Sequence, residues 1–152
     1  MPERTVEAWR NLWFHTGDAG RFDKQRRLFY IDRIKDCIRR RGENISAFEV
    51  EQVINGHPEV AESCVIGVHD QAAGGEDEVK ACIVATGNAP EYTSILDYCV
   101  ERMPRYAVPR YIEYVHTLDK TPTGKLQKQN LRDAGITDNT WDRHSIGYVV
   151  PR

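Results

Sequence analysis

The sequence lacks a strong net charge, a long apolar run and an apolar leader, and each absence excludes a class of protein. Its formal net charge is −2 over 152 residues, which provides no general attraction for nucleic acid or for an acidic membrane surface. No apolar stretch approaches the length that spans a bilayer, and MPERTVEAWRNLW has no apolar signal core. We therefore expect a cytoplasmic protein with no membrane span and no nucleic-acid partner.

Metal-binding and phosphate-loop motifs are absent as well. The PTGK stretch looks like the end of a P-loop, but Walker A requires G-x-x-x-x-G-K-[ST]. Asp119 occupies the position of the first glycine, and Leu126 replaces the Ser or Thr that would hold magnesium. The cysteines form no C-x-x-C pair and have no histidine at metal-ligand spacing, so we predict no metal site and expect reduced thiols: Cys37, Cys64, Cys82 and Cys99.

Periodicity and turn residues predict a small α+β domain. Ser46 and Glu49 form an S-x-x-E capping box at the start of a helix that Gly56 and Pro58 end. The order of elements indicates a small, mostly antiparallel sheet with helices packed on one face. The other predicted elements are a hairpin of strands at 20–23 and 27–32, a short strand within 33–45, strands at 60–70, 78–86 and 110–116, and helices at 94–103 and 126–135.

Several polar residues near turns are candidates for binding, although each has a simpler explanation. Asp18 in HTGD presents a carboxylate that can accept two hydroxyl donors such as a ribose diol, or it is an ordinary turn aspartate. Arg33 and Lys35 lie on one side of an extended DRIKD segment, where solvated ion pairs are the alternative. Lys125 follows a Pro/Gly turn that projects it toward a phosphate or carboxylate, or into solvent.

The arginines of IRRRGENIS are a further candidate. Arg39, Arg40 and Arg41 precede Gly42, and guanidinium groups suit phosphate, so the triplet could form a phosphate patch. A nucleic-acid-binding domain would show further basic stripes with interleaved aromatic residues. The acidic remainder of the chain does not supply them.

Four stretches in a fixed order carry a family resemblance: WFHTGDAGRFD, LFYIDRIKDCIRRRGENISAFEVEQVI, HPEVAESCVIGV and TPTGKLQKQNLR. Together they resemble the C-terminal domain of the adenylate-forming superfamily, which includes acyl-CoA synthetases, the adenylation domains of peptide synthetases and luciferases. The resemblance covers roughly residues 5 to 135. It looks closest to crotonobetaine/carnitine–CoA ligases or fatty acid–CoA ligases.

The resemblance implies a role for each candidate residue. Asp18 matches the carboxylate that binds the ribose hydroxyls of ATP or AMP, and Arg33 matches the arginine that assists there. Lys35 falls at the hinge between two domain orientations. Gly42 matches the glycine that lines the pantetheine tunnel for CoA. Lys125 matches the catalytic lysine that stabilises negative charge on the α-phosphate and the attacking carboxylate.

The resemblance also implies a two-step ligase reaction in which ATP and CoA are substrates. A carboxylate attacks the α-phosphate of ATP and gives acyl-AMP and pyrophosphate. The C-terminal domain then rotates, and the CoA thiol displaces AMP to form the thioester. Mg²⁺ is expected for the whole enzyme but not as a ligand bound by this chain.

The predicted domain organisation follows from the same resemblance. Residues 1–32 correspond to a hairpin remnant of the large N-terminal AMP-binding domain, 33–135 to the C-terminal lid, and 136–152 to a tail without a strong period. The family's phosphate loop, adenine-binding segment and acyl pocket belong to the N-terminal domain and do not occur here. We therefore expect the chain alone to be inactive, and the sequence does not name the carboxylic acid.

Two other functions remain open. The chain could be a free-standing module, derived from such a lid, that binds CoA or a protein partner without catalysis, or an RNA-binding domain that uses its arginines. Retention of all four implied substrate-binding and catalytic positions favours the ligase: Asp18, Arg33, Gly42 and Lys125. Trp13, Phe14 and Tyr30 on the hairpin remnant allow self-association if their usual partner domain is missing, or they pack locally within the hairpin.

Overall fold

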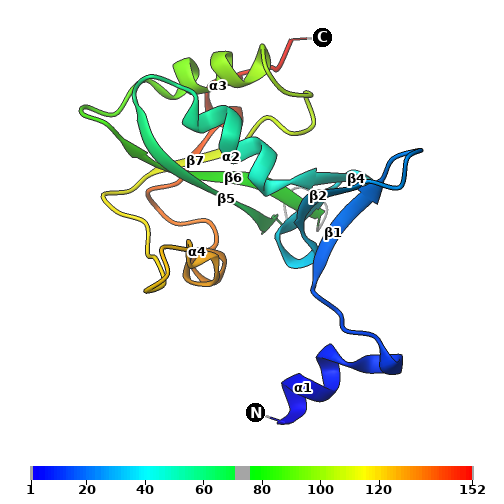
Figure 1. The fold of residues 1–152 in the computed structure, drawn as a ribbon. Helices are drawn as coiled ribbons and strands as arrows, with labels where there is room; N and C mark the ends of the chain where they lie inside the picture. The colour runs from blue at the N-terminus through cyan, green and yellow to red at the C-terminus, as the bar shows by residue number, and fades with distance from the viewer. Residues whose placement is uncertain (1, 71–75, 152) are drawn as a thin grey trace. The chain divides into compact units, whose positions relative to one another are not determined.

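The computed structural model describes residues 2–70 and 76–151, and its ribbon is drawn in Figure 1. The chain divides into two compact units, the first ending at Asp36 and the second beginning at Cys37.

The first unit consists of short helices and a β-hairpin. It contains helix α1 (Pro2–Ala8), the 3₁₀ helix η1 (Arg10–Leu12), strands β1 (Asp18–Phe22) and β2 (Leu28–Arg33), and the 3₁₀ helix η2 (Ile34–Asp36). The two strands pair antiparallel, which confirms the predicted hairpin. Asp23 closes its turn, because its carboxylate accepts hydrogen bonds from the backbone N–H groups of Arg27 and Gln25. These bonds, led by the one from Arg27, hold the pKa of Asp23 below its ordinary value.

The second unit begins with a hairpin that leads into a helix. Strands β3 (Cys37–Arg40) and β4 (Glu43–Ser46) pair antiparallel where the sequence predicted a single short strand. Helix α2 (Ala47–Asn55) starts as predicted, since Ser46 Oγ accepts a hydrogen bond from the backbone N–H of Glu49 at 3.2 Å. Gly56 is its C-cap residue. The capping signal therefore located this helix correctly.

A four-stranded sheet forms the centre of the second unit. Its order is β5 (Val60–Asp70), β6 (Glu76–Ala85), β7 (Tyr111–Tyr114) and β8 (Trp141–Asp142). The pairs β5–β6 and β7–β8 are antiparallel, whereas β6–β7 is parallel. The predicted α+β class with a mostly antiparallel sheet is confirmed.

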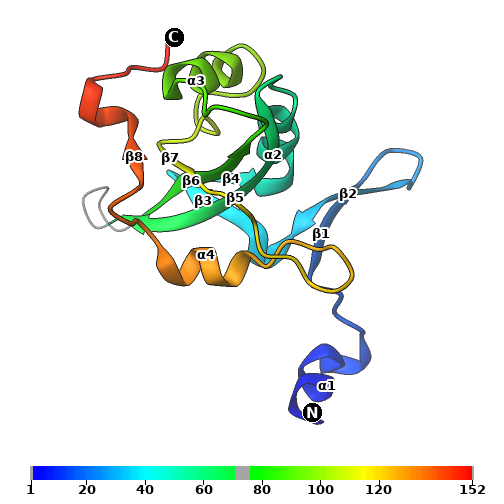
Figure 2. The ribbon, with the colours of Figure 1, turned by 90° about the vertical axis from the view of Figure 1, so that its left-hand side faces the viewer.

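Helices cover both faces of this sheet, as Figure 1 and Figure 2 show: α2 and α3 (Tyr92–Val100) lie on one side and α4 (Lys128–Ala134) on the other. Val65 and Ala81 face the cluster that includes α2 and α3. Their neighbours Ile66 and Cys82 face a second cluster that includes Leu131 of α4. The prediction that all helices share one face is wrong for α4, because β5 and β6 are apolar on both faces and both must be covered.

Three of the four cysteines are buried in these clusters. Burial raises the pKa of the Cys64 and Cys99 thiols to about 12 and that of Cys82 to about 11. These thiols therefore stay neutral at physiological pH and act as small apolar side chains.

The segment after residue 135, for which the sequence predicted no regular element, is an ordered part of the second unit. Strand β8 pairs with β7, and the 3₁₀ helix η4 (Arg143–Ile146) follows it. The Trp141 ring stacks on Tyr92, with ring centroids 4.6 Å apart. Val150, near the end of the described chain, is buried. A two-residue strand has no periodicity, so sequence patterns could not reveal it.

A buried ion pair ties this segment to the sheet. Lys80 Nζ on β6 lies 2.7 Å from Glu113 Oε2 on β7 and also donates to the carbonyl of Gly135. The hydroxyls of Thr137 and Thr140 donate to the same Glu113 oxygen. Burial alone would raise the pKa of Glu113, but hydrogen bonds from Lys80, Thr140 and Thr137 outweigh it and hold the pKa below its ordinary value.

Replacing Glu113 by Gln should destabilise the fold in a pH-dependent way. Glu113→Gln leaves Lys80 buried without its carboxylate, so the free energy of unfolding at pH 7 should fall by about 3 kcal/mol. The folded-state pKa lies below the ordinary value of 4.5, so the carboxylate stabilises the fold above that value and less as the pH falls through the folded pKa. Urea denaturation from pH 7 to pH 3 should show the difference between wild type and variant shrinking.

Glu101→Gln is the matched control for that experiment. Glu101 pairs with Arg102 at 2.8 Å, but its side chain is 70% exposed, so its loss should change stability by less than about 0.5 kcal/mol. Equal effects at the two positions, or a difference that persists at acid pH, would contradict the role assigned to Glu113.

Candidate functional site

Three of the five predicted site residues line one hollow within the first unit. A cavity of about 930 Å³ is bounded by Asp18, Arg33 and Lys35, together with His15 and Thr16 of the segment before β1. The structure therefore brings together the two residues expected at the ribose and the residue expected at the hinge.

Asp18 and Arg33 form an ion pair across the hairpin. They lie directly opposite one another in the β1–β2 register, and Arg33 Nε is 3.1 Å from Asp18 Oδ1. The Asp18 side chain is 36% exposed and that of Arg33 47% exposed, so this pair adds little to stability. Within the described residues, Asp18 Oδ2 has no hydrogen-bond partner. The carboxylate can therefore accept hydrogen bonds from the hydroxyl groups of a bound ligand, while the Arg33 guanidinium fixes the orientation of the carboxylate.

Lys35 lies at the junction of the two units. It is the middle residue of η2 and is exposed, and the first unit ends at the next residue, Asp36. A change in the backbone torsion angles of Lys35 would therefore occur one residue before the end of the first unit, where a hinge between the units would lie.

Gly42 lies at the tip of the β3–β4 hairpin. Arg41 has a φ of 50° and Gly42 a φ of 83°, so the turn has two central residues in the left-handed region that glycine favours. A Cβ placed on Gly42 would have no heavy atom within 4 Å. The backbone N–H of Arg41 donates to Glu76 Oε2 at 3.0 Å. Gly42 therefore presents bare backbone beside the start of β6.

Lys125 lies in a closed turn of the second unit. The backbone N–H of Thr121 donates to the Lys125 carbonyl at 2.7 Å, and the Thr121 hydroxyl accepts from the Lys125 N–H at 3.1 Å. Nearby, Lys120 Nζ lies 2.6 Å from Glu62 Oε2 on β5. Lys125 itself is exposed, and among the residues that the structure describes its ammonium has no ion-pair partner. Its charge is therefore available for a ligand.

Gly42 and Lys125 are positioned at opposite ends of the central sheet. The Gly42 hairpin is bonded to Glu76, which pairs with Asp70 at the far end of β5. The Lys125 turn is tied to Glu62 near the start of β5. At about 3.3 Å per residue, the stretch of β5 from Glu62 to Asp70 spans roughly 26 Å. One ligand atom cannot contact both residues at once.

Sequence reasoning missed the residues that hold the Lys125 turn. Lys120 and Thr121 precede Lys125 in KTPTGK, but their partners are Glu62, far away in the sequence, and the backbone of Lys125 itself. The Thr-Pro-Thr-Gly composition signals a turn with side-chain to backbone bonds. Nothing in the sequence pairs Lys120 with Glu62.

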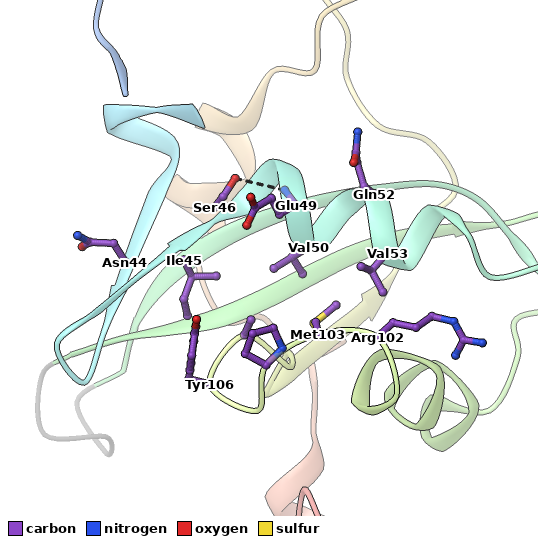
Figure 3. A pocket seen from close by; sticks show the side chains of 12 residues that line it. Asn44, Ile45, Ser46, Glu49, Val50, Gln52, Val53, Arg102, Met103 and Tyr106 are labelled. Carbon is purple, nitrogen blue, oxygen red and sulfur yellow. Dashed lines mark hydrogen bonds between the residues drawn. The ribbon is translucent and has the colours of Figure 1, made fainter. Parts of the chain in front are cut away.

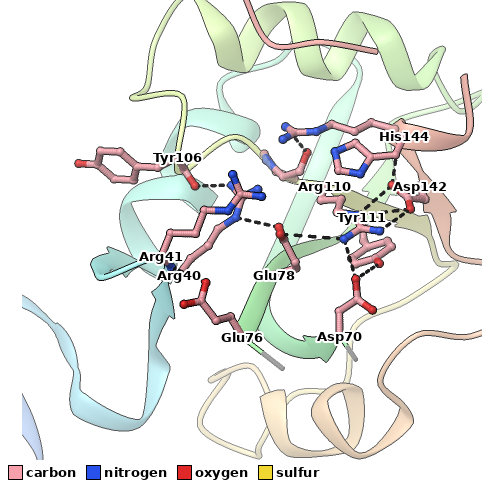
Figure 4. Close-up of polar contacts among 12 residues, drawn as sticks. Arg40, Arg41, Asp70, Glu76, Glu78, Tyr106, Arg110, Tyr111, Asp142 and His144 are labelled. Atoms are coloured by element: carbon pink, nitrogen blue, oxygen red, sulfur yellow. Dashed lines mark hydrogen bonds and ion pairs between the residues drawn. The ribbon is translucent and has the colours of Figure 1, made fainter. Parts of the chain in front are cut away.

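The arginine triplet does not form the patch that the sequence suggested. Arg40 is 4% exposed, and its Nε lies 2.8 Å from Glu78 Oε2, as Figure 4 shows. Its Nη1 donates to the Tyr106 carbonyl. Side chains alternate along a strand, so Arg40 points inward while Arg39 stays exposed. The three arginines therefore do not share one surface.

A second hollow, of about 480 Å³, lies between β4, α2 and the segment after α3 (Figure 3). Ile45, Val50, Val53 and Met103 form its apolar wall, and Arg102 lies at its edge. None of the five predicted site residues lines it. The sequence-based candidates therefore belong to other surfaces.

The described part of the chain shows neither a metal cluster nor a membrane-spanning helix. Within residues 2–70 and 76–151, no group of three or more His, Cys, Asp or Glu side chains is arranged to hold a metal ion. In the same residues, no helix is both long and apolar enough to cross a bilayer.

The chain matches a known domain family. Residues 49–125 match the model of the AMP-binding enzyme C-terminal domain. The crystal structure of the anthranilate CoA ligase AuaEII in complex with anthranoyl-AMP is similar, with a TM-score of 0.77 and 34% identity, and the match covers 89% of this chain and 27% of that one. The resemblance stated from the motifs is confirmed.

Curated relatives are CoA ligases of much greater length. Long-chain-fatty-acid–CoA ligase FadD13 of Mycobacterium tuberculosis is 39% identical over 132 residues, which cover 87% of this chain and 26% of that protein. Crotonobetaine/carnitine–CoA ligase of Citrobacter koseri is 34% identical over 133 residues, which cover 86% of this chain and 25% of that protein. The chain thus spans about a quarter of the length of these relatives.

The backbone geometry at Gly42 predicts that Gly42→Ala lowers the stability of the fold slightly. The loss comes only from the positive φ, which alanine disfavours. The positive φ of 83° disfavours any side chain, but a Cβ there meets no atom within 4 Å. We expect the free energy of unfolding to fall by about 1 kcal/mol without loss of the fold. Gly87→Ala is the matched control, because its Cβ also meets nothing and its φ is not positive. Urea denaturation measures both, and a loss above about 3 kcal/mol for Gly42→Ala would contradict the open environment.

Proposed function

The chain belongs to the AMP-binding enzyme C-terminal domain family, and from that premise we propose that it acts as the catalytic lid of an ATP-dependent acyl-CoA ligase. In this proposal a carboxylic acid, ATP and CoA are converted to acyl-CoA, AMP and pyrophosphate through an acyl adenylate. The relatives named above are CoA ligases, which supports the substrate class but not the identity of the acid.

The observation that carries the proposal is the separation of Gly42 from Lys125. The two residues lie at opposite ends of β5, one near Glu76 and the other near Glu62. A two-step reaction performed at one site needs two different sets of groups, one for each step. A lid that turns about its junction can present one end of its sheet for the first step and the other end for the second.

In the first step Lys125 supplies positive charge. The acid's carboxylate oxygen forms a bond to the α-phosphorus of ATP, and the bond to pyrophosphate breaks. Negative charge increases on the phosphoryl oxygens during this attack, and a lysine ammonium held near them stabilises it. The Thr121 bonds to Lys125 restrict the backbone from which the ammonium extends, so less freedom is lost when the ligand is bound.

Asp18 and Arg33 would hold the ribose. Asp18 Oδ2, which has no hydrogen-bond partner among the described residues, would accept hydrogen bonds from the ribose hydroxyls, while Arg33 holds the other carboxylate oxygen at 3.1 Å. The open hollow of about 930 Å³ around them accommodates a sugar ring, so the residues present fit this substrate.

In the second step Gly42 would line the approach of the CoA thiol. The thiol loses its proton to solvent, its sulfur bonds to the acyl carbon, and the bond between that carbon and the AMP oxygen breaks. Bare backbone at Gly42, with no atom within 4 Å of a Cβ position, allows a narrow pantetheine chain to pass. Lys35, at the end of the first unit, is the proposed hinge residue.

The proposal requires a partner domain with a phosphate cradle and an acyl pocket. Trp13 is 76% exposed and Phe14 56% exposed in the first unit, and contact with such a domain would bury them; self-association would use the same side chains. Mg²⁺ would act with ATP through the partner domain. We place the enzyme in the cytoplasm, a location supported by four cysteines that form no disulfide.

Complementation tests the proposed role of Lys125. The chain is mixed with the separately produced N-terminal domain of a related acyl-CoA ligase, and AMP formation is followed with a carboxylic acid, ATP and CoA. Activity should require both pieces. Lys125→Ala should lower the adenylation rate at least about 100-fold, whereas thioester formation from supplied acyl-AMP should change little because Lys125 does not take part in it.

Lys24→Ala is the matched control, since Lys24 is an exposed lysine of the β1–β2 turn and should not affect either step. A mixture that stays inactive while the chain alone binds CoA, with the same affinity for wild type and Lys125→Ala, would replace the lid proposal with a non-catalytic CoA-binding module.

A further inference from the structure

Strand β5 has a neighbouring strand of its sheet on one side only, because it is the first in the order β5-β6-β7-β8. On its other side, two side chains bond to the backbone of Val65. The Val65 N–H donates to Glu51 Oε1 at 2.7 Å, and the Val65 carbonyl accepts from Lys128 Nζ at 3.3 Å. Val65 is fully buried, so both backbone groups need such partners. Glu51 and Lys128 therefore do what a further strand would do at this point.

Glu51 and Lys128 belong to helices on opposite faces of the sheet. Glu51 lies in α2 and Lys128 is the first residue of α4, and Figure 1 and Figure 2 show the two helices on either side of β5. Lys128 Nζ lies 2.7 Å from Glu51 Oε1, the oxygen that also accepts from Val65. The ion pair therefore passes around the edge of β5 and joins the two helices.

Burial restricts the position of the Lys128 side chain. The Glu51 side chain is 11% exposed and that of Lys128 is 14% exposed. Little water can replace either partner, so the loss of one of them is more costly than the loss of a partner in an exposed pair. A lysine on a surface has a flexible stem, but this one is held by a carboxylate and a carbonyl.

Lys128 fixes one end of the turn that carries Lys125. Hydrogen bonds within the turn give it its shape, but they do not attach it to the sheet. Two ion pairs attach it. At the start of the turn Lys120 pairs with Glu62 at 2.6 Å, but these side chains are 44% and 31% exposed. Directly after the turn lies the buried Lys128 pair, which is therefore the stronger attachment.

We propose that Glu51 and Lys128 position Lys125 for the adenylation step. This inference rests on the proposed ligase function, in which the Lys125 ammonium approaches the α-phosphate of ATP. A catalytic group works best when its backbone is already held, because a displacement of about 1 Å costs a large part of the rate. Glu51 and Lys128 bond to each other and to Val65, so they act through the turn as positioning residues.

The proposed effect is specific to the first step. The Gly42 hairpin, which serves the second step in the ligase proposal, lies at the other end of β5 and is bonded to Glu76. Loosening the start of α4 changes the position of Lys125 and leaves that hairpin in place. A loss of rate confined to adenylation therefore separates a positioning role from a general loss of the fold.

Amide hydrogen exchange on the chain alone tests whether the pair holds the turn. Lys128→Met keeps an unbranched side chain and removes the ammonium. The N–H groups of Thr121 and Gln127, which bond across the turn, should exchange at least about tenfold faster in this variant. The N–H groups in the middle of β6 should keep their wild-type rates. Lys128→Arg restores a cation and should return the two turn rates to within about threefold of wild type.

The complementation mixture tests the consequence for the reaction, with the two half-reactions measured separately. Lys128→Met should lower kcat for adenylation at least about tenfold. It should change KM for ATP by less than about twofold, because the lysine of the turn acts mainly in the transition state. Thioester formation from supplied acyl-AMP should also stay within about twofold of wild type. An equal loss in both half-reactions would show a structural role only and would overturn the proposal.

Gln129→Ala is the matched control. Gln129 follows Lys128 in α4, is exposed, and its side-chain amide donates to Asp133 of the same helix, so its loss should change neither the exchange rates nor either half-reaction. Glu51→Gln is a second test if Lys128→Met does not fold. It keeps an oxygen for the Val65 N–H and removes the charge that faces Lys128, so it should change the same measurements in the same direction.

The exchange experiment decides this proposal separately from the ligase proposal. Wild-type exchange at Thr121 and Gln127 in both Lys128→Met and Glu51→Gln would overturn it, even if the mixture is active. A wild-type mixture that forms no AMP would instead contradict the ligase function. Faster exchange confined to the turn would still show that the pair holds Lys125 in place.

Discussion

The antiparallel pairing of β5 with β6 is the constraint on which the second unit depends. This ladder runs from Val60 opposite Ala85 to Asp70 opposite Glu76, and most of its side chains are buried on both faces. Both faces must therefore be covered, which places α2 and α3 on one side and α4 on the other. The length of the same ladder sets the distance between the Gly42 hairpin and the Lys125 turn. Their separation is a property of the strands rather than of either loop.

Buried charges determine how the later part of the chain is attached to this sheet. Lys80 joins Glu113 and the carbonyl of Gly135, and Arg110 joins Asp70 and Asp142. A buried ion pair gives little net stability compared with apolar packing, but losing one partner is costly. Gly135 and Asp142 belong to the later part of the chain, so we infer that these contacts help to fix the position of β8 and η4. The same arrangement brings Arg143 beside Arg40.

The elements with strong local signals were predictable from the sequence. The Ser46 and Glu49 capping box located α2, and the β-branched runs located β5 and β6, because these signals arise between residues close in the chain. The face covered by α4 was not predictable, since apolar residues on both sides of β5 do not say which helix packs where. Strand β8 was also missed, because Trp141 and Asp142 form a strand only by pairing with β7.

For the candidate site, the sequence by itself determined the residue types, the turns that present them and the family whose motifs they match. Pro122 and Gly124 make a turn before Lys125, and Gly42 permits a positive φ, whatever surrounds them. The tertiary structure alone decided that Arg40 turns inward to Glu78 and that Lys128 meets Glu51 at the edge of β5. The physical reason is that ion pairs depend on distances between strands and helices far apart in the chain, which no local pattern encodes.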